Sequence, residues 1–169
     1  MKPITLLISI FLLLGLTTGC GKKTAYLNPP SIKDIAVITV DDNLPERTLE
    51  QTRELKITLE WMNRDLIKNF EEAGFHATLI KDMQTYKPEM GRRLIINVER
   101  FNPGNRAARA FVGLGAGPAA LGLNYKLLDE TNSLLLEWRD DVGSNKGPTY
   151  CAENLNKKAI NKIVGLMNK

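Results

Sequence analysis

Two alternating apolar runs joined by a short polar turn constrain the fold of this chain more than any other feature. Leu121 to Leu127 and Leu134 to Trp138 both alternate between large apolar residues and small or polar ones, and Asp129-Glu130-Thr131-Asn132 separates them. A period of two is typical of strands with one buried face, so the pair predicts an antiparallel hairpin. Asn132 suits the left-handed backbone conformation that such a turn often requires.

A glycine-rich segment precedes the hairpin. Gly115 to Ala120 matches the Gly-x-Gly-x-x-Ala fingerprint of dinucleotide-binding proteins. That fingerprint requires a helix directly after it, whereas the residues that follow it here alternate as a strand does. We therefore expect a glycine-rich bend or bulge between strands, and no bound cofactor. The segment before it, Arg106 to Val112, fits either one turn of helix or a strand.

The remaining periodicities predict three more strands and two helices. Strands are expected over residues 35–40, 75–80 and 92–101, and a final helix over about residues 149–167. A long helix is expected after Asp41 to Asn43, which offer N-cap side chains, with Pro45 in its first turn and Gly74 ending it. Its buried stripe is Leu55, Leu59, Met62, Leu66, Phe70 and Ala73.

These elements predict a single α/β (α+β) domain over residues 33–169. The run over residues 35–40 is β-branched except at Ala36 and therefore fits a central strand, with residues 75–80 parallel to it across the long helix. We expect a mixed sheet of about five strands with two amphipathic helices on one face. Residues 143–148 are expected to form a loop.

The first 19 residues have the features of a signal peptide. Lys2 supplies a positive charge, and the apolar run from Ile4 to Leu16 has 13 residues. A membrane span needs about 20, so this run fits an export signal better than a transmembrane helix. A buried N-terminal helix is the alternative.

The end of this signal resembles a bacterial lipoprotein box. Leu16-Thr17-Thr18-Gly19 brings small residues up to Cys20, although the usual box has Leu where Thr17 stands. The resemblance implies a diacylglycerol on the Cys20 sulfur and an acyl chain on its amino group, which suffice for stable anchoring. Gly21 implies sorting to the outer membrane, facing the periplasm. Ordinary secretory cleavage is the alternative, and residues 20–32 are expected to form a flexible tether.

Composition limits the other classes of site. If Cys20 is lipidated, Cys151 has no partner within the chain and is expected to pack as a small apolar residue at a helix start, with an intermolecular disulfide as the alternative. His76 is the single histidine, so a zinc site is not expected. A net charge of +4 is too mild to favour nucleic acid as a partner.

Arginines supply the candidate binding residues. Arg92, Arg100, Arg106 and Arg109 could bind an anionic ligand or an acidic partner. The alternative is that they form structural ion pairs with Glu99, Asp129 and Asp140.

The same region carries a family resemblance. Asn102-Pro103-Gly104, Arg106, Arg109, the glycines from Gly113 to Gly117 and Asp129-Glu130-Thr131 resemble the pattern of a domain of unknown function found in small Gram-negative lipoproteins. That pattern has Asp-Pro-Gly, two spaced arginines, Gly-x-Gly-x-Gly and Asp-x-x-Thr-Gly, so Asn102 and Asn132 depart from it. The resemblance covers roughly residues 35–167. It implies an α/β domain displayed in the periplasm, with no established activity.

No set of residues specifies a reaction, so we do not expect an enzyme. The expected function is that of an outer-membrane-anchored lipoprotein, a non-catalytic binding or assembly component of the cell envelope. Its expected partners are the membrane, through the lipid anchor, and envelope proteins or an anionic envelope ligand. One alternative is a module that binds anionic glycan or lipid through the arginines. A second is an exported enzyme, which would need a reactive cluster assembled by the fold.

Overall fold

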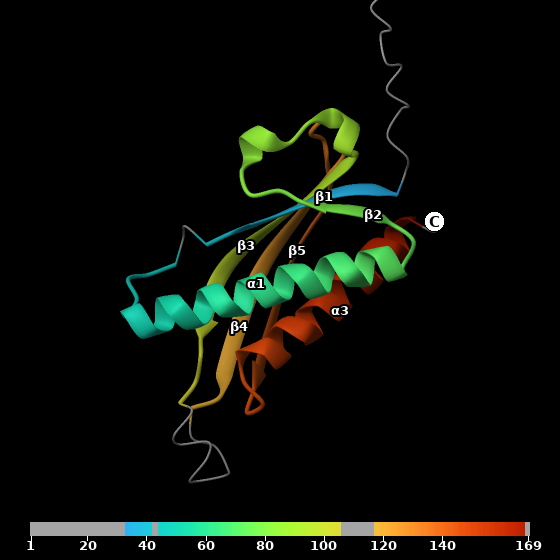
Figure 1. The fold of residues 1–169 in the computed structure, drawn as a ribbon. Coiled ribbons are helices and arrows are strands. Elements are labelled where there is room, and N and C mark those ends of the chain that lie inside the picture. Colours follow the sequence, from blue (N-terminus) through green and yellow to red (C-terminus); the bar gives the residue numbers. More distant parts are fainter. Residues whose placement is uncertain (1–32, 42–43, 106–116, 168–169) are drawn as a thin grey trace, which may run out of the picture.

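The structure, a computed structural model, describes residues 33–41, 44–105 and 117–167. These residues form one mixed sheet and two long helices, as predicted (Figure 1). The strands are β1 (Asp34–Val40), β2 (His76–Leu79), β3 (Arg92–Asn102), β4 (Ala119–Leu128) and β5 (Leu134–Ser144). The helices are α1 (Leu49–Glu72) and α3 (Pro148–Met167), and two 3-10 turns, η1 (Met83–Thr85) and η2 (Pro88–Met90), follow β2.

The sheet has the strand order β2-β1-β3-β4-β5. β1 pairs in parallel with both β2 and β3, whereas β3, β4 and β5 pair antiparallel. The central position of β1 and its parallel pairing with β2 confirm the prediction from its β-branched sequence. Ile35, Ala36, Val37 and Ile38 are all buried, because β1 has strands on both sides and apolar residues above and below it.

The start of α1 differs from the prediction. The helix begins at Leu49, and its N-cap is Thr48 rather than a residue of the Asp41 to Asn43 segment. The Thr48 side chain accepts a hydrogen bond from the Gln51 backbone N–H, and the Gln51 side chain accepts one from the Thr48 N–H. This reciprocal capping box satisfies two N–H groups that the helix leaves unpaired, so Thr48 provides the better start. Pro45 therefore lies in the connection before the helix.

The end of α1 agrees with the prediction. Gly74 follows the C-cap residue Ala73 and has φ +83°, the left-handed conformation that favours glycine. Ala73 itself is exposed, because it lies after the last helical residue, and so it does not extend the buried stripe as expected. The helical residues Leu55, Met62, Leu66 and Phe70 are fully buried, and Leu59 is partly buried against the same core.

Both helices lie side by side on one face of the sheet (Figure 1). Asn156 of α3 joins them: its side-chain amide donates to the Met62 carbonyl at 2.9 Å and to an Asp65 carboxylate oxygen at 2.8 Å. Cys151 is fully buried at the start of α3, as predicted. Among the described residues, no helix is sufficiently long and apolar to cross a membrane.

The β4–β5 hairpin is confirmed, with one extension. Asn132 has φ 68°, the conformation expected of it. β5 continues through Ser144, so the predicted loop over residues 143–148 is shorter than expected. Gly143 pairs with Ala120 of β4, and this pairing partner is distant in the sequence. Residues 1–32 and 106–116, which hold Cys20, Arg106, Arg109 and most of the glycine segment, lie outside the described residues.

Candidate functional site

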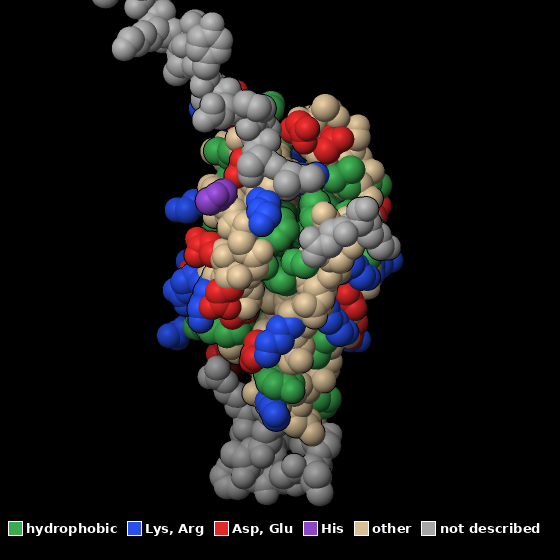
Figure 2. Space-filling model, turned by 90° about the vertical axis from the view of Figure 1, so that its right-hand side faces the viewer, with side chains coloured by type: hydrophobic (Ala, Val, Ile, Leu, Met, Phe, Trp, Pro, Cys, Tyr) green, Lys and Arg blue, Asp and Glu red, His purple; other side chains and the backbone are tan. Residues whose placement is uncertain are grey.

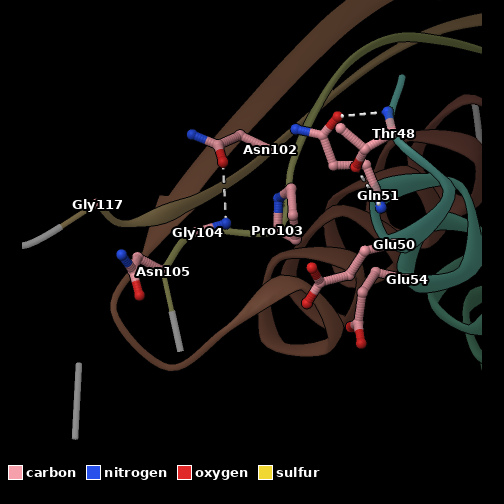
Figure 3. A pocket seen from close by; sticks show the side chains of 9 residues that line it. All are labelled: Thr48, Glu50, Gln51, Glu54, Asn102, Pro103, Gly104, Asn105 and Gly117. Carbon is pink, nitrogen blue, oxygen red and sulfur yellow. Dashed lines mark hydrogen bonds between the residues drawn. The ribbon is translucent and has the colours of Figure 1, made fainter. Parts of the chain in front are cut away.

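A hollow of about 640 Å³ lies where β3 ends and α1 begins (Figure 3). It is open to solvent on the surface of the domain. The residues that line it are Thr48, Glu50, Gln51, Glu54, Asn102, Pro103, Gly104, Asn105 and Gly117. The hollow therefore joins two parts of the chain that are about 50 residues apart in the sequence.

The first wall of the hollow is the first turn of α1. The Thr48–Gln51 capping box fixes the direction in which the chain enters the helix. Glu50 and Glu54 are four residues apart, so they lie on the same side of the helix, below Pro103 in Figure 3. Glu50 also lies in the first turn of α1, where the helix dipole favours a negative charge.

The second wall is the turn that follows β3. The Asn102 side chain accepts a hydrogen bond from the Gly104 N–H at 2.9 Å, and Gly104 has φ 71°. An Asx turn of this kind replaces the strand pairing that β3 loses at its end. The Asn105 N–H donates a hydrogen bond to the Gly117 carbonyl at 3.1 Å. Asn105 and Gly117 therefore lie side by side at this end of the sheet.

The side chains around the hollow suit binding better than catalysis. Among the described residues, its lining has two carboxylates and three amides, and no lysine, arginine, histidine or cysteine. The Thr48 hydroxyl is engaged in the helix cap. These residues can accept hydrogen bonds from a partner's N–H groups or attract its positive charge, but they supply no nucleophile with an adjacent base.

The described candidate arginines do not lie together. Arg92 is the first residue of β3 and Arg100 is near its other end. They are eight positions apart along the strand, a distance of about 27 Å. One small anion therefore cannot contact both side chains. Arg106 and Arg109 lie outside the described residues, so their distance to Arg100 stays untested.

Arg100 forms an ion pair with Asp141 of β5 across Gly122 of β4. A Cβ atom on Gly122 would lie 2.7 Å from an Asp141 carboxylate oxygen and 3.3 Å from the Arg100 Cβ. Glycine is therefore required here, because the two longer side chains meet above it. The ion-pair partner of Arg100 is therefore Asp141, which is not one of the three acids expected.

Glu99 and Asp140 have other partners. The pairing of β3 with β4 shifts register between Val98 and Arg100, so Glu99 is the extra residue of a bulge. Its carboxylate pairs with Arg139 at 3.2 Å. Asp140 pairs with Lys158 of α3 at 3.4 Å. A second hollow, of about 360 Å³, lies between these charges and holds more acidic than basic side chains among its lining residues. It therefore offers an anion little attraction.

At the opposite end of the sheet, the arginines hold the hairpin turn. Arg93 donates a hydrogen bond to the Asn132 side chain, and its guanidinium lies 4.4 Å from the centre of the Tyr86 ring. Asp129 accepts hydrogen bonds from Thr131 and Ser133. These hydrogen bonds, the Thr131 hydroxyl above all, hold the pKa of the Asp129 carboxyl below its usual value, and the nearby Arg92 charge adds to this effect.

Metal and cofactor sites find no support in the described part of the chain. No three His, Cys, Asp or Glu side chains there gather at metal-binding distance. His76 is exposed on the edge strand β2 and appears alone, in purple, in Figure 2. The same view shows basic and acidic side chains interspersed rather than separated. After Gly117 the chain enters β4 and not a helix, so the dinucleotide fingerprint lacks the element it requires.

Sequence reasoning missed the hollow, although one signal for it was present. Thr48-x-x-Gln51 has the spacing of a capping box, and Glu50 and Glu54 flank it on one side of the helix. The sequence could not indicate that the turn over Asn102 to Asn105 lies beside the start of α1. That proximity depends on the parallel pairing of β1 with β3.

Comparison with known protein families identifies the domain. A model of the family described as Domain of unknown function (DUF4410) matches residues 26–159. The chain belongs to this family. The match covers the sheet, α1 and the first part of α3, and it agrees with the resemblance to a domain of unknown function drawn from the arginines and glycines. No curated protein matches the sequence.

Solved structures show distant likenesses. The PelC dodecamer from Paraburkholderia phytofirmans has 11% sequence identity and a TM-score of 0.45, with 80% of this chain and 86% of that chain covered. A structure reported as a neuraminyllactose-binding hemagglutinin homolog from Helicobacter pylori has 10% identity and a TM-score of 0.39, with the same coverage of 80% and 86%. Because the TM-scores are below 0.5, these likenesses assign neither a ligand nor an assembly to this chain.

Proposed function

We propose that this protein is an outer-membrane-anchored lipoprotein whose domain is a non-catalytic binding or assembly component of the cell envelope. The anchor is Cys20, at the end of the lipoprotein box. The observation that carries the proposal is the position of the hollow relative to the point where the tether joins the domain.

Lys33, where the described domain begins, and the hollow are at opposite ends of the sheet. The described chain starts at Lys33 and enters β1, and the start of β1 pairs with the start of β3 at Arg92. β3 then runs for 11 residues, or about 36 Å, to the Asn102 turn at the hollow. A domain held at Lys33 would present the hollow away from the membrane, toward partners in the periplasm.

The length of the tether fits this arrangement. Residues 20–32 contain two consecutive prolines and several polar residues, a composition typical of an extended linker. Fully extended, such a segment spans at most about 45 Å. The domain could therefore move over a comparable distance from the membrane surface while staying attached to it.

Fatty-acid labelling in cells tests the anchor. Cys20→Ala is expected to abolish incorporation of labelled palmitate and to release the protein from the membrane fraction. The matched control is Cys151→Ala, which removes the other cysteine of the chain from a buried position and should keep the label. Label retained on Cys20→Ala would disprove the anchor.

Site-specific photo-crosslinking tests the binding role. A benzoylphenylalanine is placed at Glu50, which lines the hollow, or at Glu130, which is exposed in the hairpin at the other end of the sheet. A distinct envelope partner should be captured from Glu50 and not from Glu130, and mass spectrometry then identifies it. Equal capture from both positions, or none from Glu50, would contradict a binding role for the hollow.

The role as a module that binds anionic glycan or lipid stays a prediction. The length of β3 limits which arginines could contact the same ligand. Arg92 is about 27 Å from Arg100 along β3, so one headgroup could involve Arg100, Arg106 and Arg109 at most. Reversing the charges of Arg106 and Arg109 should then abolish retention on anionic lipid vesicles without lowering the melting temperature. Unfolding of that variant would assign the arginines a structural role.

A further inference from the structure

The two edges of the sheet differ in length and in protection. In the described part of the chain, β2 and β5 are the edge strands. β2 has only four residues and is followed directly by η1 and η2. β5 has 11 residues and extends for about 37 Å. The strand order gives β5 no neighbour on its outer side, so a long row of backbone donors and acceptors faces outward there.

β5 carries charged side chains, which can discourage edge strands from pairing, but they are of both signs, so a partner strand can match them. Residues 134–144 include neither proline nor lysine, and its one register irregularity is at the very start, opposite Leu128. Leu134 and Leu135 are large apolar side chains that are 55% and 40% exposed. We propose that β5 is the interface through which two copies of this chain pair, antiparallel and about a twofold axis, to form one continuous sheet.

Symmetry leaves few possible registers. A twofold axis perpendicular to the sheet keeps the helix-covered face on the same side in both copies, so the register can change only in steps of two residues. The axis must then pass beside one residue near the middle of β5, which would lie opposite its own copy. Trp138, Arg139 and Asp140 are the three positions that keep most of the strand paired.

Charge complementarity, together with the pairing of apolar side chains, favours the register centred on Asp140. Arg139 of each copy then lies opposite Asp141 of the other. This gives two cross-strand ion pairs on the uncovered face, which is the face of the sheet opposite α1 and α3. The two side chains pair with Glu99 and Arg100 within the chain, but they are 74% and 50% exposed, so both remain accessible to a second copy. Trp138 lies opposite Val142 on the covered face, which pairs apolar side chains with each other.

The other two registers are less favourable. Centring the pair on Arg139 places the two Arg139 side chains opposite each other and Glu137 opposite Asp141, so like charges meet three times. Centring it on Trp138 also gives two ion pairs, Glu137 with Arg139, but it places the apolar Leu135 and Leu136 opposite Asp141 and Asp140. Neither arrangement matches charge and polarity as well as the first.

Lysines of α3 supply positive charge beside β5 in the register centred on Asp140. Lys158 pairs with Asp140 at 3.4 Å, and Lys162 lies 5.3 Å from the centre of the Trp138 ring. Both lysines therefore lie over β5 on the covered face. In the pair centred on Asp140, the two Asp140 carboxylates approach each other and the two Lys158 ammonium groups offset their repulsion.

Co-purification of differently tagged copies tests this pairing in the full-length protein, extracted in detergent. Wild-type copies should co-purify. Arg139→Glu in both copies places two carboxylates opposite each other, and Asp141→Arg in both copies places two guanidinium groups opposite each other. Each variant alone should lose co-purification at least ten-fold. When one tag carries Arg139→Glu and the other Asp141→Arg, the charges are complementary again and co-purification should return.

The mixed pair separates a specific interface from damage to the fold, since a misfolded variant cannot regain a partner. Arg64→Glu makes the same charge change at an exposed position of α1 and should co-purify as the wild type does. The proposal is overturned if wild-type copies do not co-purify, as when a strand of another protein occupies β5. It is also overturned if the mixed pair fails to form although both variants melt cooperatively.

Discussion

The two faces of the sheet are built from different chemistry, although β3, β4 and β5 contribute to both. The face under α1 and α3 presents apolar side chains that lie opposite one another across β3 and β4: Leu94, Ile96, Val98, Leu121, Leu123, Tyr125 and Leu127. The other face carries three cross-strand ion pairs on the same strands, namely Lys126 with Glu137, Arg139 with Glu99, and Arg100 with Asp141.

This difference separates stability from specificity. Burial of apolar surface contributes about 25 cal/mol per Å², so the covered face supplies most of the free energy of folding. Exposed ion pairs contribute about 0–1 kcal/mol each, so the uncovered face supplies little. Its charges instead determine which residues meet across the strands, and they remain accessible to other molecules. The predictions below test this division, from the largest expected effect to the smallest.

Phe70→Ala should have the largest effect. Phe70 is fully buried between α1 and the sheet, and its ring packs edge-to-face on Phe75 with centroids 5.5 Å apart. Its removal leaves a cavity and should lower the free energy of unfolding by about 3–5 kcal/mol. Leu49→Ala is the control on the same helix: Leu49 is 92% exposed, so a change within about 0.5 kcal/mol is expected in urea denaturation. Similar losses of stability in both variants would contradict the conclusion that the covered face supplies most of the free energy of folding.

Gly122→Ala should have the next largest effect, although it changes the uncovered face. The added Cβ would meet an Asp141 carboxylate oxygen at 2.7 Å, so the Arg100–Asp141 pair must move. A loss of about 1–3 kcal/mol is expected in thermal or urea denaturation.

Two comparisons isolate the cause of the Gly122 effect. In an Asp141→Ala background, most of the loss should disappear, because the carboxylate that blocks the Cβ is gone. Gly165→Ala on α3 meets no atom within 4 Å and should raise stability by about 0.5–1 kcal/mol. If Gly122→Ala costs as much with Asp141 absent, the clash is not its cause.

Tyr125→Phe should stabilise the protein. Tyr125 brings a hydroxyl group into the apolar core of the covered face: its ring stacks on Trp138 with centroids 4.6 Å apart, and burial raises the pKa of the hydroxyl. Within the described residues, that hydroxyl has no hydrogen-bond partner. Removing it should raise the free energy of unfolding by about 1 kcal/mol.

Tyr86→Phe is the matched control for Tyr125→Phe. The Tyr86 hydroxyl donates to the Gly91 carbonyl at 2.7 Å, so its loss should destabilise the protein by about 0.5–1.5 kcal/mol. The two substitutions are chemically identical and are expected to have opposite signs. Destabilisation by Tyr125→Phe would indicate that the buried hydroxyl is satisfied.

The Lys126–Glu137 pair should have the smallest effect. The two groups are 3.5 Å apart, and their side chains are 43% and 42% exposed. A double-mutant cycle with Lys126→Ala and Glu137→Ala should give a coupling of about 0.2–1 kcal/mol that decreases as salt is added. A coupling above 2 kcal/mol, independent of salt, would assign the uncovered face a larger part in stability.

Local sequence patterns were sufficient to predict most of the fold. The hairpin, the central β1, the α1 stripe from Leu55 to Phe70 and the glycine end of α1 all depend on local spacings, and all are confirmed. The errors occurred where one local rule competed with another or with distant pairing. Asp41 to Asn43 and Thr48 are both reasonable N-caps, and the Gln51 side chain decides between them. β5 continues to Ser144 because β4 pairs with it, which its own sequence does not indicate.

The site was harder to predict, because it depends on how elements meet. The arginines are close in sequence, but an extended strand separates Arg92 from Arg100. Two of the acids expected beside them pair elsewhere, Glu99 with Arg139 and Asp140 with Lys158. The bulge at Glu99 also changes which residues of β4 lie opposite the end of β3. A bulge of one residue leaves little trace in an alternating pattern, whereas it changes every later neighbour across the sheet.

The parallel pairing of β1 on both sides has a mechanical consequence. The tether enters the domain at the start of β1, which pairs with β2 over residues 34–37 and with β3 over residues 35–40. A pull on Lys33 against a partner held beyond Asn102 would act along the strand direction. The load would then be shared by many hydrogen bonds in shear, instead of opening them one at a time. The arrangement of the strands therefore suits a domain that is pulled from its first residue.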